Sequence, residues 1–388
     1  MQPLEINERI MIIHFGELWL RGKNRNRYIS RLIRNITQGL NNESFSLVYY
    51  YDRILLRFSK DSNIESIEKK IKNVFGISAY EFAVVGKPTI ESIKKIFLYE
   101  IKNIDSKTVK TIKITSHRSF KGLSFNSLDV ISELTKLAEK KGLNISNHTY
   151  DIEFSVNITK DYSFTYSKKL KGAGGLPVGS SGVAVILISG GLDSPVAAWY
   201  AMKRGLQPVF VHIHAYPNND EAYGTKIKDI YEVLSSYATK PKLYLFPSSE
   251  FQLLSTKLGR STTVVLKSFM LNLADKVAER EHSSLIYTGE SLGQVSSQTP
   301  SNILAESVGI KRQILRPLIG LDKDEIVKIS RNIGTFDLSI KEYKDICSIN
   351  SRNASTSITL EEIKKLSKEI GMKKLVLKTF KKFKLIYQ

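Results

Sequence analysis

The sequence predicts an α/β protein in which a doubly wound parallel sheet follows smaller α+β units. After residue 183, short apolar strands alternate with helices, which is the order of a parallel sheet with helical crossovers. The run from Val183 to Ile188 is rich in β-branched residues, and a glycine turn follows it directly. In the first 75 residues, the order strand, helix, two strands and helix is typical of a ferredoxin-like unit.

Length and composition narrow the class of protein. A chain of 388 residues is long enough for two or three domains. Lys and Arg number 58 against 38 Asp and Glu, a net charge of +20 that indicates a polyanionic partner. A lysine-rich proteome or a demand for solubility would give the same excess. The single cysteine excludes an internal disulfide. Without a signal peptide or an apolar run near the ~20 residues of a membrane span, we expect a cytoplasmic protein with no membrane contact.

The first unit is expected to begin with a strand and to carry a basic helix. Arg27, Arg31 and Arg34 share one face of that helix, where they could bind a phosphate backbone or be a plain solvated face. The expected strands and the closing helix of this unit are Arg9 to Phe15, two strands within Leu47 to Phe58, and a helix at Ile64 to Val74.

A second unit and a linker follow. The segment His117 to Phe125 mixes cations with aromatic rings, which suits RNA but also describes a basic loop beside a core. Gly, Ser and Pro dominate Lys171 to Gly182, so we expect a linker there. The expected helices are Ile90 to Ile101 and Val130 to Lys140, and the expected strands are Val109 to Ser116, Asp151 to Ile158 and Tyr162 to Ser167.

The last part of the chain is the doubly wound sheet. In such sheets ligands bind outside the carboxyl ends of the strands, where Ser189, His214 and Gly289 lie. Asp322 and Glu325 have the spacing of a capping box at the start of a helix. After Val183 to Ile188, the expected elements are strands at Pro208 to Ile213, Leu243 to Phe246 and Leu285 to Thr288, and helices at Tyr223 to Ser236 and Val264 to Arg280.

The glycine turn predicts an anion site. It runs from Ser189 to Ser194 and leads into a helix with Pro195 in its first turn. No Gly-Lys-Ser/Thr closes it, so it is not a Walker loop. The pattern Ser-Gly-Gly-x-Asp-Ser instead resembles the PP-loop of ATP pyrophosphatases, which cleave ATP to AMP and pyrophosphate. The amides of Gly190 and Gly191 and the two serine hydroxyls would hold pyrophosphate. Asp193 would hold Mg²⁺ or cap the helix.

Three further features carry chemistry. The segment Thr288 to Thr299 is rich in small and amide side chains, which favours a nucleotide-binding loop. Lys267 stands on an apolar helix and would reach a phosphate or extend to the surface. Cys347 has polar neighbours and Lys344 nearby, which favour a thiolate that could carry a persulfide; a buried structural thiol is the alternative.

Together these motifs resemble the tRNA 4-thiouridine synthetases, the tRNA sulfurtransferases also called ThiI. The resemblance covers nearly the whole chain, and the last two of its blocks distinguish this family from other PP-loop enzymes. The matching blocks are Phe15 to Arg25, Gly174 to Gly179 with Ser189 to Ala197, Gly289 to Gln298, and Arg316 to Lys323.

The resemblance implies three domains and a set of site residues. The domains would be ferredoxin-like (1–75), an RNA-binding THUMP domain (76–168), a linker (169–182) and the PP-loop domain (183–388). Catalysis would fall to Cys347 and Asp193, with ATP and Mg²⁺ as cofactors and no metal held by the protein alone. The implied ATP contacts are Leu187, Ile188, Ser189, Gly190, Gly191, Ser194, His212, Ile213, Lys267, Gly289 and Gln298.

The implied reaction has two steps. ATP adenylates the C4 oxygen of uridine 8 in tRNA, and sulfur from a persulfide on Cys347 then displaces AMP. The partner would be the tRNA acceptor end, bound by THUMP and the N-terminal domain. With one cysteine and no rhodanese domain, we expect a short form that needs an external sulfur donor, such as a cysteine desulfurase or sulfide. Sulfur transfer toward the thiamine thiazole and a homodimer are compatible with the family, and no stretch of sequence argues for either.

Two rival functions remain at this stage. Another PP-loop enzyme that modifies tRNA would couple adenylation to an amine and would need no thiol. A non-catalytic tRNA-binding protein would keep only a relic of the nucleotide site.

Overall fold

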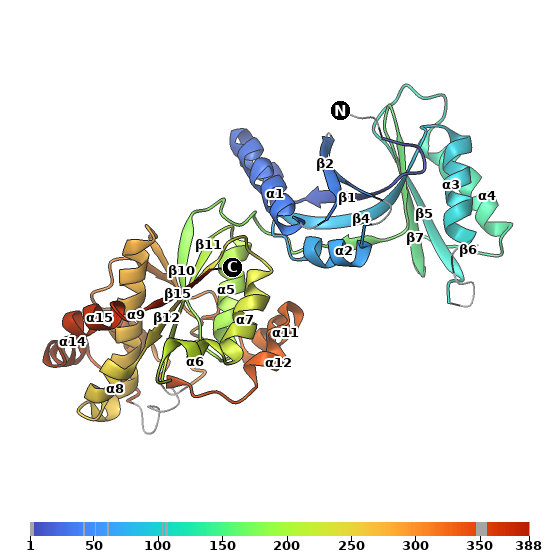
Figure 1. Cartoon of the computed structure of the whole chain (residues 1–388). Helices are drawn as coiled ribbons and strands as arrows, with labels where there is room; N and C mark the ends of the chain where they lie inside the picture. Colours follow the sequence, from blue (N-terminus) through green and yellow to red (C-terminus); the bar gives the residue numbers. More distant parts are fainter. Residues whose placement is uncertain are drawn as a thin grey trace. The chain divides into compact units, whose positions relative to one another are not determined.

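The computed structural model describes residues 4–41, 43–50, 52–59, 62–102, 104, 108–295, 297–346 and 355–387 (Figure 1). The chain forms two compact units. The first unit comprises residues 1–19, 40–72 and 77–174, and the second comprises residues 20–39, 73–76 and 175–388. Of the residues described, no helix is long and apolar enough to cross a membrane.

The first unit is built on one nine-stranded sheet of mixed direction. Its order is β2-β3-β1-β4-β8-β7-β5-β6, with β9 paired beside β4. The pairs of β5 with β6 and with β7 are parallel, and the others are antiparallel. The strands are β1 Arg9–Phe15, β2 Phe45–Tyr50, β3 Arg53–Phe58, β4 Ile77–Gly86, β5 Thr111–Arg118, β6 Asn144–Ile145, β7 Ile152–Ile158, β8 Ser163–Tyr166 and β9 Lys169–Lys171.

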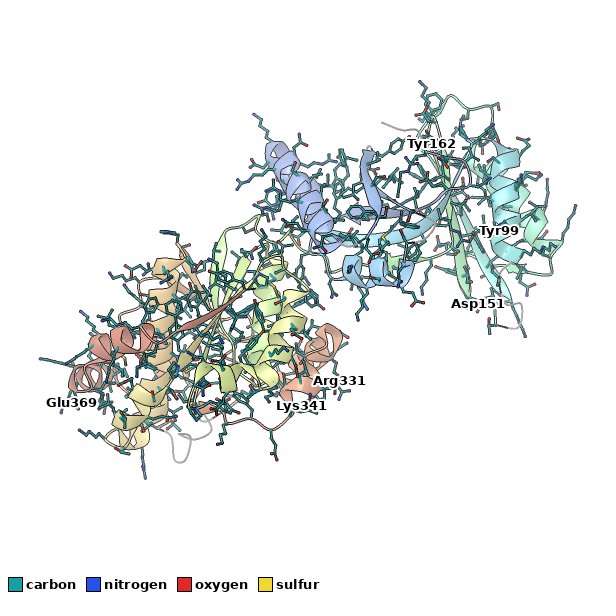
Figure 2. All side chains as sticks on the ribbon, viewed as in Figure 1. Tyr99, Asp151, Tyr162, Arg331, Lys341 and Glu369 are labelled. Carbon is teal, nitrogen blue, oxygen red and sulfur yellow. The ribbon has the colours of Figure 1, made fainter. Side chains whose placement is uncertain are left out.

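The helices of the first unit bury its apolar faces. They are α2 Ile64–Lys72, α3 Ile90–Lys102 and α4 Ser127–Glu139. Helices α3 and α4 pack on each other, and α4 packs on β5 around a core that includes Phe97, Leu134 and Phe154. Asp151, labelled in Figure 2, accepts hydrogen bonds from the amides of Lys110 and Thr111, so it fastens the start of β5 beside β7.

The sequence missed one strand that changes the architecture. Helices and strands were expected on both sides of Ile77–Gly86, but β4 itself was not. This strand pairs with β1 and with β8, so the two N-terminal segments share one sheet. Its buried Glu81 interrupts the apolar pattern, and the Lys169 ammonium at 3.5 Å compensates that charge, with the His14 ring 3.1 Å from the same carboxylate.

The second unit contains the doubly wound sheet that the sequence predicts. Its order is β14-β13-β10-β11-β12-β15, with the first five strands parallel. The edge strand β15 is antiparallel to β12 and was not expected. The strands are β10 Val183–Leu187, β11 Gln207–His214, β12 Lys242–Pro247, β13 Leu285–Tyr287, β14 Gln313–Leu315 and β15 Lys384–Tyr387.

Helices cover both faces of this sheet (Figure 1). Helices α10, α14 and α15 pack with α9 over the larger core, and α5 packs with α7 and α11 over the other. The bounds are α5 Asp193–Lys203, α6 Asn219–Tyr223, α7 Lys226–Ser235, α8 Ser249–Ser255, the 3₁₀ turn η2 Gly259–Ser261, α9 Thr262–Arg280, α10 Pro300–Glu306, α11 Lys323–Ile333, α12 Phe336–Ser339, α14 Leu360–Glu369 and α15 Met372–Phe380.

The basic helix of the N-terminal segment belongs to the second unit. It is α1 Arg25–Gly39, and the 3₁₀ segment η1 Glu17–Asn24 precedes it. The buried Asn35 of α1 donates a hydrogen bond to the Val178 carbonyl at 3.0 Å. Leu176 and Val178 are buried and Lys169–Lys171 form β9, so the predicted linker contains a strand and a packed segment.

Candidate active site

The glycine turn after β10 is held in shape by its two serines. The Ser194 hydroxyl accepts a hydrogen bond from the Ser189 amide at 2.7 Å and lies 3.0 Å from the Ser189 hydroxyl. The Ser189 hydroxyl in turn accepts from the Gly191 amide at 3.2 Å. These hydrogen bonds within the chain hold the turn in shape.

The N-terminus of α5 is open toward this turn. The N-cap residue is Leu192, whose side chain makes no capping hydrogen bond. The first N–H groups of a helix have no partner within the helix, and together with the helix dipole they form an anion site. The residues present therefore fit a phosphate group.

Asp193 does not cap the helix, so that alternative interpretation is wrong. It is the first helical residue, and its carboxylate accepts hydrogen bonds from Gln294 at 3.1 Å and from Lys323 at 3.0 Å. Its side chain therefore joins α5 to the loop after β13 and to the start of α11. A capping box starts α11, with Asp322 and Glu325 in the predicted roles.

Gly289 packs directly against the backbone of α5. A Cβ atom at this position would lie 2.7 Å from the Ser194 nitrogen and 2.8 Å from the Asp193 carbonyl carbon. Only glycine allows this approach, which brings the loop after β13 to the glycine turn. In the same loop, the buried Oε1 atoms of Gln294 and Gln298 have no hydrogen-bond partner among the described residues, and such atoms suit a polar ligand.

His212 stands at the end of β11, beside the turn. Its Nδ1 lies 2.9 Å from the Ile188 carbonyl, and its Nε2 lies 2.7 Å from the Tyr343 hydroxyl. A carbonyl only accepts, so Nδ1 carries the proton and Nε2 accepts from the tyrosine. The ring is 2% exposed, and this burial lowers its pKa to about 4, with His214 adding to the effect. His212 is therefore neutral at pH 7.

The buried histidine predicts a loss of stability in acid. The unfolded chain takes up a proton near the ordinary histidine pKa of 6.5, whereas the folded chain does so only near 4. The free energy of unfolding should therefore fall, as the pH drops through this window, by up to about 3 kcal/mol. Urea unfolding at several pH values measures this, and His212→Asn should remove much of the slope. His148→Gln, at an exposed histidine, should leave it; a slope unchanged in His212→Asn contradicts the assignment.

The segment after α12 lies over the glycine turn. A Cβ atom on Gly190 would come within 2.9 Å of the Tyr343 ring and 2.7 Å of the Lys226 side chain. The Lys226 ammonium donates to the carbonyls of Ser339 at 2.7 Å and Lys341 at 2.6 Å. Lys341 is labelled in Figure 2. The predicted Cys347 follows this segment and lies outside the described residues.

Lys267 lies in a cluster of charges with 15% of its side chain exposed, and its ammonium pairs with two buried carboxylates instead of extending to the surface. Its ammonium lies 3.3 Å from Glu290 and 3.5 Å from Glu306, and Arg316 lies 2.5 Å from Glu290. Burial alone would raise the pKa of Glu290, but the two cations lower it to about 2. Burial, followed by the charge of Glu290, raises the pKa of Glu306 to about 9.

The structure brings most of the predicted site residues to one edge of the sheet. Leu187, Ile188 and the turn continue β10, and His212 and Ile213 end β11 beside them. Sequence reasoning assigned no role to several residues that hold the site together. The amide-rich loop contains Glu290 and Gln294, and the last matching block ends at Lys323, so a sequence signal covered these three without giving them a role. No sequence signal links the remaining residues to the turn, and they are Lys226, Glu306 and Tyr343.

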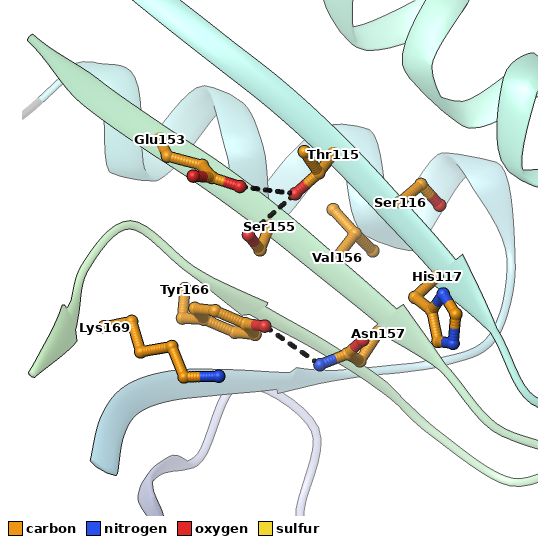
Figure 3. A pocket seen from close by; sticks show the side chains of 9 residues that line it. All are labelled: Thr115, Ser116, His117, Glu153, Ser155, Val156, Asn157, Tyr166 and Lys169. Atoms are coloured by element: carbon orange, nitrogen blue, oxygen red, sulfur yellow. Dashed lines mark hydrogen bonds between the residues drawn. The ribbon is translucent and has the colours of Figure 1, made fainter. Parts of the chain in front are cut away.

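A separate hollow lies on the sheet of the first unit (Figure 3). Its volume is about 340 Å³, and Thr115 links its lining by hydrogen bonds to Glu153 and Ser155 at 3.1 and 2.8 Å. It has no glycine turn and no helix N-terminus.

Nearby, Arg118 donates to the Phe125 carbonyl, so one predicted RNA-binding cation is tied to its own loop. Among the described residues, no three His, Cys, Asp or Glu side chains gather as a metal site.

Comparison with known proteins places the chain in a family. The family described as thiamine biosynthesis protein (ThiI) matches residues 179–372, and the ThiI ferredoxin-like domain matches residues 10–80. A "Probable tRNA sulfurtransferase" of Bacillus licheniformis is 36% identical over 90% of this chain and 88% of its own length. A protein of the same description from Thermoanaerobacter sp. is 33% identical over 95% of this chain and 97% of its length.

A solved structure agrees over almost the full length. A crystal structure of a 4-thiouridine synthetase–RNA complex with bound ATP superposes with a TM-score of 0.88 and 29% identity, covering 98% of this chain and 99% of that one. A Pyrococcus horikoshii protein shares the fold, with a TM-score of 0.65 and 18% identity over 84% of this chain and 99% of that chain. With domain matches at both ends and full-length relatives above 30% identity, the chain belongs to the ThiI family.

Proposed function

We propose that this protein is an ATP-dependent tRNA sulfurtransferase that converts uridine 8 of tRNA to 4-thiouridine. The observation that carries the proposal is the preformed glycine turn at the uncapped end of α5, with Gly289 packed on its backbone and Asp193 held by Lys323. The relatives described as probable tRNA sulfurtransferases, and the ATP-bound synthetase–RNA complex, support the substrate and the nucleotide.

In this proposal, the glycine turn holds the phosphates of ATP. The amide of Gly190 and the first amides of α5 would donate to the phosphates, with Gly191 shaping the turn, and Asp193 would hold Mg²⁺. Leu187, Ile188, His212 and Ile213 lie at the neighbouring strand ends, where the adenosine would sit. Gln298 and Lys267 approach from the loop after β13 and from α9. When bound, ATP supplies the AMP group that makes the C4 oxygen of uridine a leaving group.

Sulfur would then reach C4 from a persulfide on Cys347. Tyr343, which precedes Cys347 by four residues in the sequence, is fixed against His212 and Gly190, and this supports the assignment of the segment to the site. The terminal sulfur of the persulfide attacks C4 and AMP departs with the former C4 oxygen. An external thiol then attacks Sγ of Cys347, which releases 4-thiouridine and leaves the cysteine in a mixed disulfide with that thiol. Sulfide restores the persulfide by displacing the thiol from this mixed disulfide. Alternatively, a second thiol frees the cysteine, and the persulfide of a desulfurase transfers its outer sulfur to it.

The first unit would bind the tRNA acceptor end. A net charge of +20 favours a polyanion, because each neutralised phosphate releases counterions. Within the proposal, residues 1–75 form the ferredoxin-like domain, 76–168 the THUMP domain, 169–182 the linker and 183–388 the PP-loop domain. The matched ferredoxin-like segment at residues 10–80 supports the first of these.

The test is a complete reaction with purified protein. Protein, tRNA, Mg-ATP, a thiol and a cysteine desulfurase with its cysteine substrate should yield 4-thiouridine, with AMP and pyrophosphate released only when tRNA is present. Asp193→Asn should lower the rate at least about 100-fold, because a neutral amide loses the ion pair with Lys323 and would be a poor ligand for Mg²⁺. Asp229→Asn, which alters an exposed ion pair with Lys341, serves as the matched control. Pyrophosphate release without sulfur incorporation would favour the amine-coupling rival, and no release at all would favour the relic-site rival.

A further inference from the structure

Four charged side chains meet in the interior of the second unit and form what we call the buried charge cluster. Its members are Lys267, Glu290, Glu306 and Arg316. Lys267 comes from α9, Glu290 follows β13, Glu306 ends α10 and Arg316 follows β14. Glu290 is adjacent to Gly289, which packs on the glycine turn, so the cluster is next to the proposed nucleotide site.

Glu290 is the carboxylate of the cluster that accepts hydrogen bonds from three side chains. Its carboxylate accepts hydrogen bonds from the Arg316 guanidinium at 2.5 Å, the Lys267 ammonium at 3.3 Å and the Thr288 hydroxyl at 3.0 Å. Charged hydrogen bonds of this kind stabilise an ionised carboxylate in spite of its burial. Glu290 is therefore the counter-ion of both cations.

Glu306 is in a setting that disfavours a charge. It is 0% exposed, it shares the Lys267 ammonium with the nearby Glu290, and it is the last residue of a helix, where the dipole repels a negative charge. Apart from its ion-pair contact with Lys267, neither oxygen has a hydrogen-bond partner among the described residues. Helix α14 also packs on α10 but supplies no charged contact to Glu306.

We propose that Glu306 is a neutral carboxylic acid that positions Lys267 for a nucleotide phosphate and leaves the buried charge cluster with one net positive charge. The inference rests on the proposed function and adds a positioning residue to it. A proton on Glu306 lets it donate a hydrogen bond to Glu290, and the raised pKa of about 9 agrees with this state at neutral pH. With Glu306 ionised, the two acids would cancel the two cations, and the attraction for phosphate would weaken.

The test compares ATP affinity in four proteins. Glu306→Ala removes the support of Lys267 and should weaken ATP binding about tenfold, equivalent to about 1.4 kcal/mol. Glu306→Gln keeps the shape and the neutral charge, so it should recover most of that loss. Glu279→Gln, at an exposed carboxylate on the same helix α9, should bind like the wild type. Equal weakening in the Gln and Ala variants would overturn the inference, because it would mean that a carboxylate charge is needed.

The pH dependence of ATP affinity distinguishes the proposed role of Glu306 from a merely structural role, which would not change that dependence. Glu306 loses its proton as the pH rises through about 9, so wild-type affinity for ATP should weaken from about pH 8 to about pH 10. Glu306→Gln should not show this change. The carboxyl C=O band of a protonated acid, assigned by infrared difference between wild type and Glu306→Gln, reports the charge state without nucleotide. Its absence at pH 7 would overturn this inference alone, whereas wild-type protein that binds no ATP would overturn the proposed function.

Discussion

Cys347→Ser should abolish 4-thiouridine formation while the protein still binds ATP and tRNA. A serine cannot carry a persulfide, and the chain has no second cysteine to replace it. We expect the rate of sulfur incorporation to fall at least about 1,000-fold, as when a nucleophile is removed from an enzyme. Sulfur incorporation is measured by the absorbance of 4-thiouridine in recovered tRNA, with a desulfurase as the donor.

The informative control for this variant is the other half-reaction. Pyrophosphate release that depends on tRNA should survive in Cys347→Ser, because the glycine turn is built from other residues. A thiol-specific reagent should label the wild type once, since the chain has one cysteine. Full activity of Cys347→Ser with the desulfurase would show that sulfur does not pass through this residue.

Gly289→Ala adds a single methyl group and should destroy the nucleotide site. The new Cβ would lie 2.7–2.8 Å from backbone atoms of Asp193 and Ser194, and a backbone cannot rotate away as a side chain can. The first turn of α5 must then move away from the loop after β13. We expect ATP affinity to fall at least about 100-fold, with a loss of about 1–3 kcal/mol in the free energy of unfolding. Equilibrium binding of ATP and urea unfolding measure the two effects.

Gly224→Ala is the matched control for that substitution. Gly224 has a helical backbone, and a Cβ atom there would meet carbonyl oxygens at 3.5 Å, an ordinary contact distance. The control should bind ATP like the wild type and be at least as stable, because alanine restricts the unfolded chain more than glycine does. If Gly289→Ala also behaves like the wild type, the close approach of the two loops is not needed for nucleotide binding.

Local sequence patterns predicted much of the fold of the second unit. The apolar β-branched run predicted β10, and the glycines predicted the turn. The spacing of Asp322 and Glu325 predicted the capping box of α11. These features depend on residues close together in the chain, so their physics is visible in the sequence. The family resemblance supplied the domain order and the site residues, which local patterns could not supply.

The roles of individual charges were decided only by the tertiary structure. Asp193 has the sequence context of an N-cap, but Lys323, which is 130 residues away, holds its carboxylate elsewhere. The sequence left open whether Lys267 reaches a phosphate or the surface, and the structure brings Glu290 and Glu306 from other elements to meet it. Strand β4 contains the buried Glu81, and its partners Lys169 and His14 come from distant parts of the chain, so local pattern does not account for a charge there.

By itself, the sequence determined the doubly wound sheet, the glycine turn at its edge and the family. Only the tertiary structure decided which charged groups face one another around that turn. The physical reason is the sequence distance over which the interactions act. Strand pattern, turn chemistry and helix caps depend on residues that are neighbours in the chain. The charge state of a buried group depends on every group that folding brings within a few ångströms.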